Sequence, residues 1–528
     1  MERKYRYDRD ESVVQTKKGR IRGLYFDGLH YFRGIRYAKA KRFQMPEPVD
    51  AWEGTLDAVS YGYNCPAHLF PGSIPRDEAI LPHRFWPESE HCQYLNVWTD
   101  TLNPNAKKAV MVWLHGGGYS DGSALDLCCY DGERLAKFDD VVVVTLNHRL
   151  NVFGHLDMSD FGPEYENSVN AGMADIVAAL GWVRDNIALF GGDPDNVTVF
   201  GQSGGGGKVA ALGQIPAADG LYHKAIIMSG VIPDDNILVR TTATPKRIVL
   251  EIMRELNLEE KQLEEFLKVP EIILVRAVER ACINLTKNGF AVGWGPKKNK
   301  WYLGCMADSG TSPYFSQVPT MVGTTLTEFG RPNSIENKQS LTVEERENAI
   351  KAMFGEEQGA RLLTLFRKAY PRVNEIYACC LDTFFRLDTL AYVRKKASQS
   401  AALVYLYLFA AEFHCNGGMA AWHSADIPFA FHNTEITPVC HTSDAVKELE
   451  TAFSQAFTNF AKTGIPSSDV LPQWEPCTGR ELKTMVFDKK CELYTEHEQE
   501  LLHYISSLLP EMKINFYGEK EEGKEYRY

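Results

Sequence analysis

Five short apolar runs between residues 94 and 228 give the chain its main structural pattern. Polar residues hardly interrupt these runs, as is typical of strands whose two faces are both covered. Helical segments separate them, and in segment 171–189 apolar residues recur at spacings of three and four. Strands that alternate with helices predict a mostly parallel sheet with right-handed crossovers. The predicted strands are 94–98, 109–114, 141–146, 197–200 and 225–228.

The segments on either side of this pattern predict further elements. Residues 12–34 form short alternating runs between glycines and charges, which predicts an N-terminal antiparallel meander. The proline-rich stretch 64–89 predicts a long surface loop. Later strands are expected at 320–323, 403–408 and 484–487, and later helices at about 445–463 and 497–509.

Two helical stretches interrupt the strand pattern. Residues about 235–315 and 335–400 are rich in Glu, Lys, Arg and Leu, and we expect both to be insertions over the carboxyl edge of the sheet. We therefore predict a single α/β domain over residues 1–517. The charged residues 518–528 that follow predict a disordered tail.

Composition and charge narrow the range of partners. With 528 residues, 44% of them hydrophobic, the chain can bury a large globular core. Its net charge of −12 argues against nucleic acid or an anionic membrane as the main partner. The charged N-terminus lacks the apolar core of a signal peptide, and no run reaches the roughly 18 apolar residues of a membrane span. We expect a cytoplasmic protein.

The twelve cysteines do not predict a metal site. There is no Cys-x-x-Cys, and the adjacent pairs at 128–129 and 379–380 suit neither zinc ligation nor mutual bridging. Buried free thiols are the simpler interpretation for most of them.

The stretch 198–207 carries the first candidate chemistry. Gly201, Ser203 and Gly205 fit Gly-x-Ser-x-Gly, in which a sharp strand-to-helix turn exposes the serine hydroxyl near the first amides of the helix. Alone this pattern is weak, because glycine-rich turns also bind phosphate. A phosphate loop ending at Lys208 would need glycine at 202 and a hydroxyl residue at 209, where the chain has Gln202 and Val209.

A second glycine-rich loop strengthens the serine interpretation. His115 and three glycines follow a strongly apolar predicted strand, which lets backbone amides approach a ligand closely. Esterases and lipases use such a loop as part of an oxyanion hole. A plain glycine turn is the alternative, but together with Gly-x-Ser-x-Gly in a doubly wound sheet the loop favours an enzyme.

Such hydrolases carry their triad in the order serine, acid, histidine. Glu328 lies in a loop just after the apolar run 320–323 and is the candidate acid. His423 lies in a loop after the strand predicted at 403–408, from which a base could reach over the sheet edge. His497 and His503 fall in a predicted surface helix and are better explained as solvated side chains.

With these residues in place, the chain resembles the type-B carboxylesterase family of α/β-hydrolases, which includes the cholinesterases, over about residues 12–509. Within the family it resembles bacterial para-nitrobenzyl-esterase-like members. Each matching block is moderately specific, but their order along the chain is very specific. The blocks are 32–38, 89–97, the loop at 115–119, 147–150 and 190–198 leading into the serine turn.

The resemblance implies a role for individual residues. It implies a triad and an oxyanion hole, with a further serine close to the acid and the histidine. Cys65 and Cys92 stand where secreted members form a disulfide, and we expect thiols here. The implied nucleophile, acid and base are Ser203, Glu328 and His423; the implied oxyanion donors are Gly117, Gly118 and Gly204; and the further serine is Ser229.

Several positions depart from the family pattern, among them the segment between Ala38 and Arg42, Thr327 before Glu328, and two positions in the serine turn and its helix. Gly204 replaces the usual alanine after the serine, which keeps the amide but loosens the turn. Lys208 lies in the first turn of the following helix, where a cation opposes the helix dipole and has no evident purpose.

The implied activity is hydrolysis of small apolar esters through an acyl-enzyme, without metal or cofactor, by a monomer or homodimer. Tyr119 and Trp422 are candidate pocket walls, whereas simple packing is favoured for Phe329. An amidase, carbamate hydrolase or acyltransferase would use the same triad. A non-catalytic binding protein on the same fold is the alternative from another class.

Overall fold

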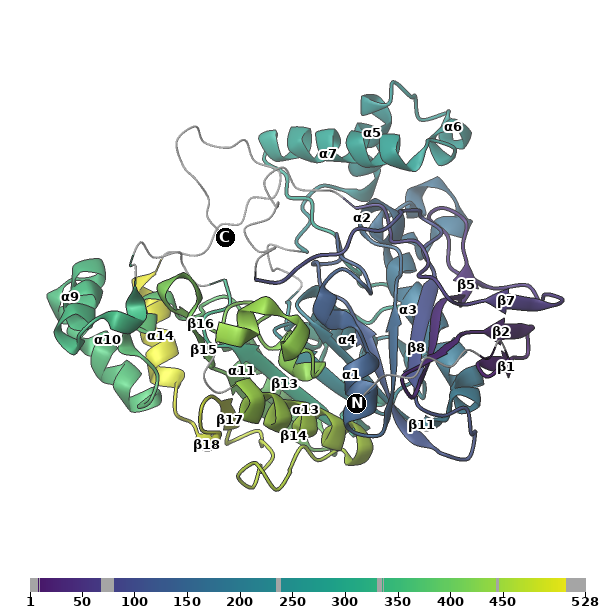
Figure 1. Ribbon diagram of the computed structural model, residues 1–528. Coiled ribbons are helices and arrows are strands. Elements are labelled where there is room, and N and C mark those ends of the chain that lie inside the picture. Colours follow the sequence, from purple (N-terminus) through teal and green to yellow (C-terminus); the bar gives the residue numbers. More distant parts are fainter. Residues whose placement is uncertain are drawn as a thin grey trace.

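A mixed sheet of eleven strands forms the centre of the computed structural model, which describes residues 8, 10–67, 80–233, 239–329, 335, 337–442 and 446–509 (Figure 1). In spatial order the strands are β18 (Glu492–Thr495), β17 (Lys483–Phe487), β14 (Val404–Phe409), β13 (Thr320–Thr325), β12 (Lys224–Met228), β11 (Gly192–Gln202), β9 (Lys108–Leu114), β10 (Val141–Leu146), β8 (Tyr94–Thr99), β4 (Leu29–Arg36) and β3 (Leu24–Phe26).

The central strands of this sheet are parallel, as predicted. Every neighbouring pair from β17 to β10 is parallel, whereas β18, β8, β4 and β3 pair antiparallel at the two edges. The predicted runs thus all form strands of one sheet, and the run beginning at Tyr94 is the antiparallel one among the first five.

The N-terminal strands pair antiparallel but do not form one meander. β1 (Val13–Gln15) and β2 (Arg20–Arg22) belong to a small sheet with β7 (Thr55–Asp57), while β3 and β4 extend the central sheet. The chain changes sheets at Gly23, where an added Cβ would lie 2.8 Å from the Phe32 ring. This close approach requires a residue without a side chain.

Helices cover both faces of the sheet. On one face α3 (Ala171–Asn186), α4 (Gly204–Leu212) and α11 (Arg386–Gln399) pack against strand residues such as Val110 and Val112. On the other face α1 (Glu133–Phe138), α12 (Ile427–Ala430) and α13 (Val446–Thr463) pack against alternate residues such as Met111 and Trp113. Burial on both faces explains the uninterrupted apolar runs of the sequence.

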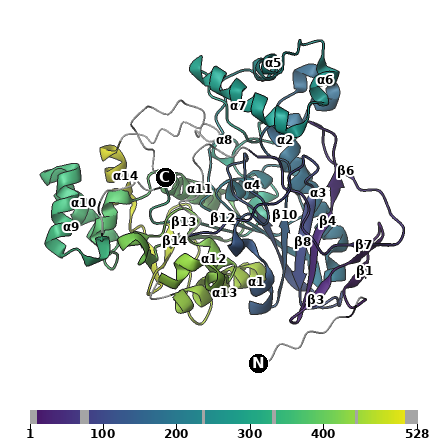
Figure 2. The same ribbon diagram turned by 45° about the horizontal axis from the view of Figure 1, so that its top comes forward.

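Two groups of helices project away from this core (Figures 1 and 2). The first contains α5 (Pro245–Glu255), α6 (Leu263–Leu267) and α7 (Glu271–Lys287), and the second α9 (Val343–Phe354) and α10 (Glu356–Ala369), with α14 (Gln499–Leu508) packed beside α10. The second predicted insertion also includes α11, which instead packs on the sheet. The tail expected at 518–528 and residues 68–79 of the expected surface loop lie outside the described residues.

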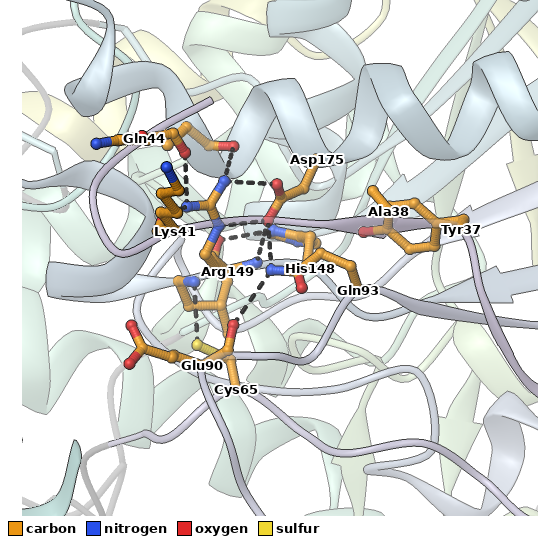
Figure 3. A network of polar contacts seen from close by, with 12 residues as sticks. Tyr37, Ala38, Lys41, Gln44, Cys65, Glu90, Gln93, His148, Arg149 and Asp175 are labelled. Atoms are coloured by element: carbon orange, nitrogen blue, oxygen red, sulfur yellow. Dashed lines mark hydrogen bonds and ion pairs between the residues drawn. The ribbon is translucent and has the colours of Figure 1, made fainter. Parts of the chain in front are cut away.

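A buried ion pair fixes the segment that follows β10 (Figure 3). The Arg149 guanidinium bonds to both carboxylate oxygens of Asp175 at 2.8 and 2.7 Å and donates to the Gln44 carbonyl at 2.8 Å. Both side chains are almost fully buried. Since breaking such a pair leaves an uncompensated buried charge, the network holds α3, this segment and the N-terminal region in register.

Candidate active site

Ser203 lies at the tip of a strained turn between β11 and α4. Its backbone has φ 59° and ψ −128°, a conformation that non-glycine residues rarely adopt. The Ser203 amide donates to the Met228 carbonyl at 2.8 Å, and the Ser203 carbonyl accepts from the Gly207 amide at 2.9 Å. Neighbouring strand and helix therefore hold the turn in place, with the hydroxyl at its tip.

The glycines around Ser203 are required by close backbone packing. A Cβ on Gly201 would lie 2.6 Å from the Leu114 carbonyl oxygen. A Cβ on Gly204 would lie 2.7 Å from the Gly118 Cα and closer still to the Gly118 amide nitrogen. The loop after β9 thus lies directly against the serine turn. This contact explains the glycine at 204, for which the sequence alone suggested only a looser turn.

The Gly116 and Gly117 carbonyls in the loop after β9 accept hydrogen bonds from within that loop. The Gly117 carbonyl accepts from the Ser120 and Asp121 amides, each at 2.9 Å, and the Gly116 carbonyl accepts from His115 Nδ1 at 2.9 Å. In a trans peptide the N–H points opposite to the preceding carbonyl. Among the described residues neither the Gly117 nor the Gly118 N–H donates a hydrogen bond, so both can face a ligand, and their φ values of 88° and 58° suit glycine.

Glu328 and His423 form a close, oriented pair. His423 Nδ1 lies 2.5 Å from Glu328 Oε2, and the His423 amide donates to the Glu328 carbonyl at 2.9 Å. The other carboxylate oxygen, Oε1, accepts from the Ser229 hydroxyl at 2.6 Å and from the Thr325 amide at 2.7 Å. The Glu328 side chain is fully buried, so its three bonds fix the imidazole orientation.

The second imidazole nitrogen of His423 meets a residue that sequence reasoning missed. Gln202 Nε2 lies 3.2 Å from His423 Nε2 and 3.4 Å from His423 Nδ1, so the amide contacts both ring nitrogens, and no hydrogen bond joins Ser203 to His423 among the described residues. The signal for Gln202 was present in the sequence, since it directly precedes Ser203.

Aromatic rings enclose the His423 imidazole. The Phe329 ring centroid lies 4.2 Å from that of His423, and the Phe385 ring stacks on it at 5.4 Å with an interplanar angle of 2°. Phe384 contacts both phenylalanines. Phe329, for which packing was favoured, thus packs directly on the imidazole. No sequence motif pointed to Phe384 or Phe385, because they come from a distant segment.

Two further buried carboxylates lie near Glu328. Burial, and then the negative charge of Glu328, raise the pKa of Asp382 and of Asp426 to about 7. Asp382 accepts from the Arg386 amide at 2.7 Å at the start of α11, which positions Phe385, and Asp426 accepts from the Tyr407 hydroxyl at 2.9 Å. Near neutral pH this cluster therefore holds less negative charge than three ordinary carboxylates would.

The two predicted pocket residues lie in different surroundings. Tyr119 is buried beside α4 and lines a small cavity with Gly207 and Ala210. Trp422 packs against Phe413 at 4.9 Å, within the hydrophobic cluster on the α13 face of the sheet. Cys65 and Cys92 are buried free thiols, and the described residues contain no cluster of side chains suited to a metal ion.

We expect Gly204→Ala to lower kcat/KM for an ester by about tenfold, because the new methyl group would push the Gly118 amide away from the serine turn. Gly181→Ala is the matched control, since a Cβ there meets nothing within 4 Å. Steady-state kinetics of both variants test this. Equal activities of the two variants would show that the loop can move without cost.

These features define a class of protein before any comparison. A parallel sheet with a strained serine between strand and helix, a glycine loop beside it and an acid–imidazole pair after later strands define an α/β-hydrolase. The chain belongs to the carboxylesterase family, whose family model matches residues 10–504.

Individual relatives agree with this assignment. The chain is 34% identical over 503 residues to the para-nitrobenzyl esterase of Bacillus subtilis, covering 92% of this chain and 97% of that protein. Among solved structures, an esterase from Clostridium hathewayi is 42% identical with a TM-score of 0.91, covering 96% of this chain and 100% of that chain. A thermophilic PNB esterase is 31% identical with a TM-score of 0.72, covering 94% and 99%.

The predictions of the family, the α/β-hydrolase fold and an ester-hydrolysing enzyme are therefore confirmed. Of the helices in the described ranges, none has both the length and the apolar character needed to cross a bilayer.

Proposed function

We propose that the protein hydrolyses small apolar carboxylic esters through Ser203, with His423 as base and Glu328 as the acid that orients it. The observation that carries this proposal is the Glu328–His423 pair, at 2.5 Å, fixed by the Ser229 hydroxyl and the Thr325 amide. The strained turn at Ser203 supports it, because such strain is kept where it serves a function.

Acylation begins with attack of Ser203 Oγ on the ester carbonyl while His423 Nε2 takes the hydroxyl proton. Ser203 Oγ must come within hydrogen-bond reach of His423 Nε2 for this step, since no hydrogen bond joins the two side chains among the described residues. Catalytic hydrogen bonds often form only with substrate in place, so the observed geometry is compatible with this step. The imidazolium next protonates the departing alcohol, and water attacks the acyl-enzyme with His423 again as base.

The amides of Gly117, Gly118 and Gly204 would bind the oxyanion of both tetrahedral intermediates. Donors already oriented before the reaction lower the barrier, and losing one typically costs about 3–4 kcal/mol. No metal or organic cofactor enters these steps.

Substrate preference is inferred from the aromatic surroundings of His423 and from the relatives. The rings of Phe329, Phe384 and Phe385 offer apolar contact area near the reacting groups. The Clostridium hathewayi relative is described as hydrolysing aliphatic aromatic polyesters. We therefore expect aryl and short-chain acyl esters to be better substrates than long-chain lipids.

The test combines p-nitrophenyl esters of increasing acyl length with labelling by an alkyl phosphonate. We expect turnover that falls with long acyl chains and stoichiometric labelling of Ser203, located by peptide mass spectrometry. Labelling without ester turnover would redirect the function to amides, carbamates or acyl transfer. If the protein shows no turnover and Ser203 is not labelled, the binding-protein alternative is supported.

A further inference from the structure

Lys208 is buried inside the candidate active site, where its amino group bonds to backbone carbonyls. Its side chain is 0% exposed, and it lies five residues after Ser203 at the start of the second turn of α4, not in the first turn as the sequence predicted. Its amino group donates to the His115 carbonyl at 2.9 Å and approaches the Gly116 carbonyl at 3.5 Å. Among the described residues no carboxylate forms an ion pair with it, although the negative charge of Asp121 favours its charged form.

Among the groups named here around Lys208, the lysine is the one that can carry a positive charge near neutral pH, where its pKa of about 7 leaves it partly protonated. His115, His148 and His155 each direct Nδ1 toward a backbone carbonyl at 2.9–3.0 Å, and burial lowers the pKa of all three imidazoles. The His115 and His148 rings stack at 5.0 Å, and His148 lies within the network of Figure 3, with Nδ1 3.0 Å from the Arg149 carbonyl. The other groups near Lys208 are Tyr119, whose ring lies 5.7 Å away, Asp121 and Cys65.

A buried lysine of this kind is expected to lower the free energy of unfolding. Burial lowers the pKa of Lys208 to about 7, because the low-dielectric interior disfavours the ammonium ion. A buried charge without an opposite charge makes folding less favourable, and an apolar side chain of similar shape would avoid this cost. Lys396 shares this burial, so what distinguishes Lys208 is the glycine loop that it contacts.

The two carbonyls that Lys208 contacts belong to the peptide units at the start of the oxyanion loop. In a planar trans peptide the carbonyl and the following N–H point in opposite directions. The Gly116 carbonyl, to which His115 Nδ1 bonds at 2.9 Å, also faces Lys208 at 3.5 Å, so the Gly117 N–H points to the other side, where an oxyanion would bind. A cation at a carbonyl oxygen also polarises the amide, which makes its N–H a stronger donor.

We propose that Lys208 is a positioning residue of the oxyanion hole, which orients the Gly116–Gly117 peptide and adds positive charge behind it. This inference rests on the proposed function, since it concerns the oxyanion that forms at Ser203. It gives a purpose to the cation at the N-terminal end of α4, where the helix dipole disfavours it.

Lys208→Met tests the proposal because methionine keeps the length of the side chain and removes the donor and the charge. We expect kcat for a p-nitrophenyl ester to fall about 10- to 100-fold, less than for complete loss of one oxyanion donor, with KM changed less than about threefold. A trifluoromethyl ketone forms a tetrahedral adduct with the serine, and its Ki should rise by the same factor as kcat falls. The matching methyl ketone should bind almost unchanged.

Lys396→Met is the matched control. Lys396 on α11 is also fully buried and donates to backbone carbonyls, those of Phe315 and Val318, and burial also lowers its pKa to about 7. It contacts neither the glycine loop nor the serine turn in the described structure. We expect its kcat and inhibitor constants to stay within about twofold of the wild type.

Lys208→Gln covers the case in which the methionine variant does not fold. Glutamine keeps one donor without the charge, and we expect a loss of kcat and of trifluoromethyl ketone affinity smaller than that of Lys208→Met. Unchanged kcat and unchanged ketone selectivity in a folded Lys208 variant would overturn the inference while leaving the esterase intact. Equal losses in Lys208→Met and Lys396→Met would also overturn it. A wild-type protein without turnover or Ser203 labelling would instead contradict the proposed function.

Discussion

Ser203→Ala is expected to lower kcat for ester hydrolysis by about 10⁵- to 10⁶-fold, the largest effect of any single substitution in this protein. The reason is that the hydroxyl oxygen forms the covalent bond of the acyl-enzyme, and no neighbouring group can take its place in the strained turn. The turn itself should survive, since backbone hydrogen bonds to Met228 and Gly207 hold it. KM should change little.

The measurement is p-nitrophenyl ester turnover together with phosphonate labelling, both of which should disappear in Ser203→Ala. Ser454→Ala is the control. It also removes a buried hydroxyl, one that donates to the Phe429 carbonyl at 2.7 Å on the opposite face of the sheet. Its activity should remain close to that of the wild type. Retention of more than about one-hundredth of the activity in Ser203→Ala would mean that another residue is the nucleophile.

The central sheet could be predicted because strands buried on both faces have continuous apolar sequences. Each apolar run became a strand, and the helix predicted at 171–189 became α3. The direction of strand pairing, and the sheet to which a strand belongs, have no such sequence pattern. The sequence of β8 is apolar like those of the parallel strands, yet β8 pairs antiparallel with β10. The chain changes sheets at Gly23, which is evident from the close packing there in the structure.

The site was predictable where a motif or the family resemblance singled out a residue. Ser203 and the glycine loop carry local patterns, whereas Glu328 and His423 were chosen by chain order and resemblance, and the structure places these two 2.5 Å apart. Contacts between distant segments have no local pattern. The packing of Phe385 on His423 and the contact of Lys208 with the His115 carbonyl both depend on the assembled fold.

Glu328→Gln should lower kcat by about 10³- to 10⁴-fold, the second largest effect, through the tautomer of His423. Glu328 Oε1 accepts two hydrogen bonds, one of them from the Thr325 amide, which cannot reverse its direction. The glutamine carbonyl oxygen will therefore occupy that position, and its NH₂ group will face His423 Nδ1. Nδ1 must then be the acceptor, which places the proton on Nε2 and prevents it from taking the Ser203 proton.

Asp426→Asn separates this tautomer effect from a general loss of charge. Asp426 belongs to the same buried carboxylate cluster but bonds to the Tyr407 hydroxyl, and its pKa is already raised to about 7. Its replacement should therefore change kcat less than about tenfold. Steady-state kinetics and the ¹H NMR resonances of the His423 ring protons in both variants provide the measurement. Similar losses of kcat in both variants would show that Glu328 acts mainly through its charge, and that the orientation of the imidazole is not what its carboxylate contributes.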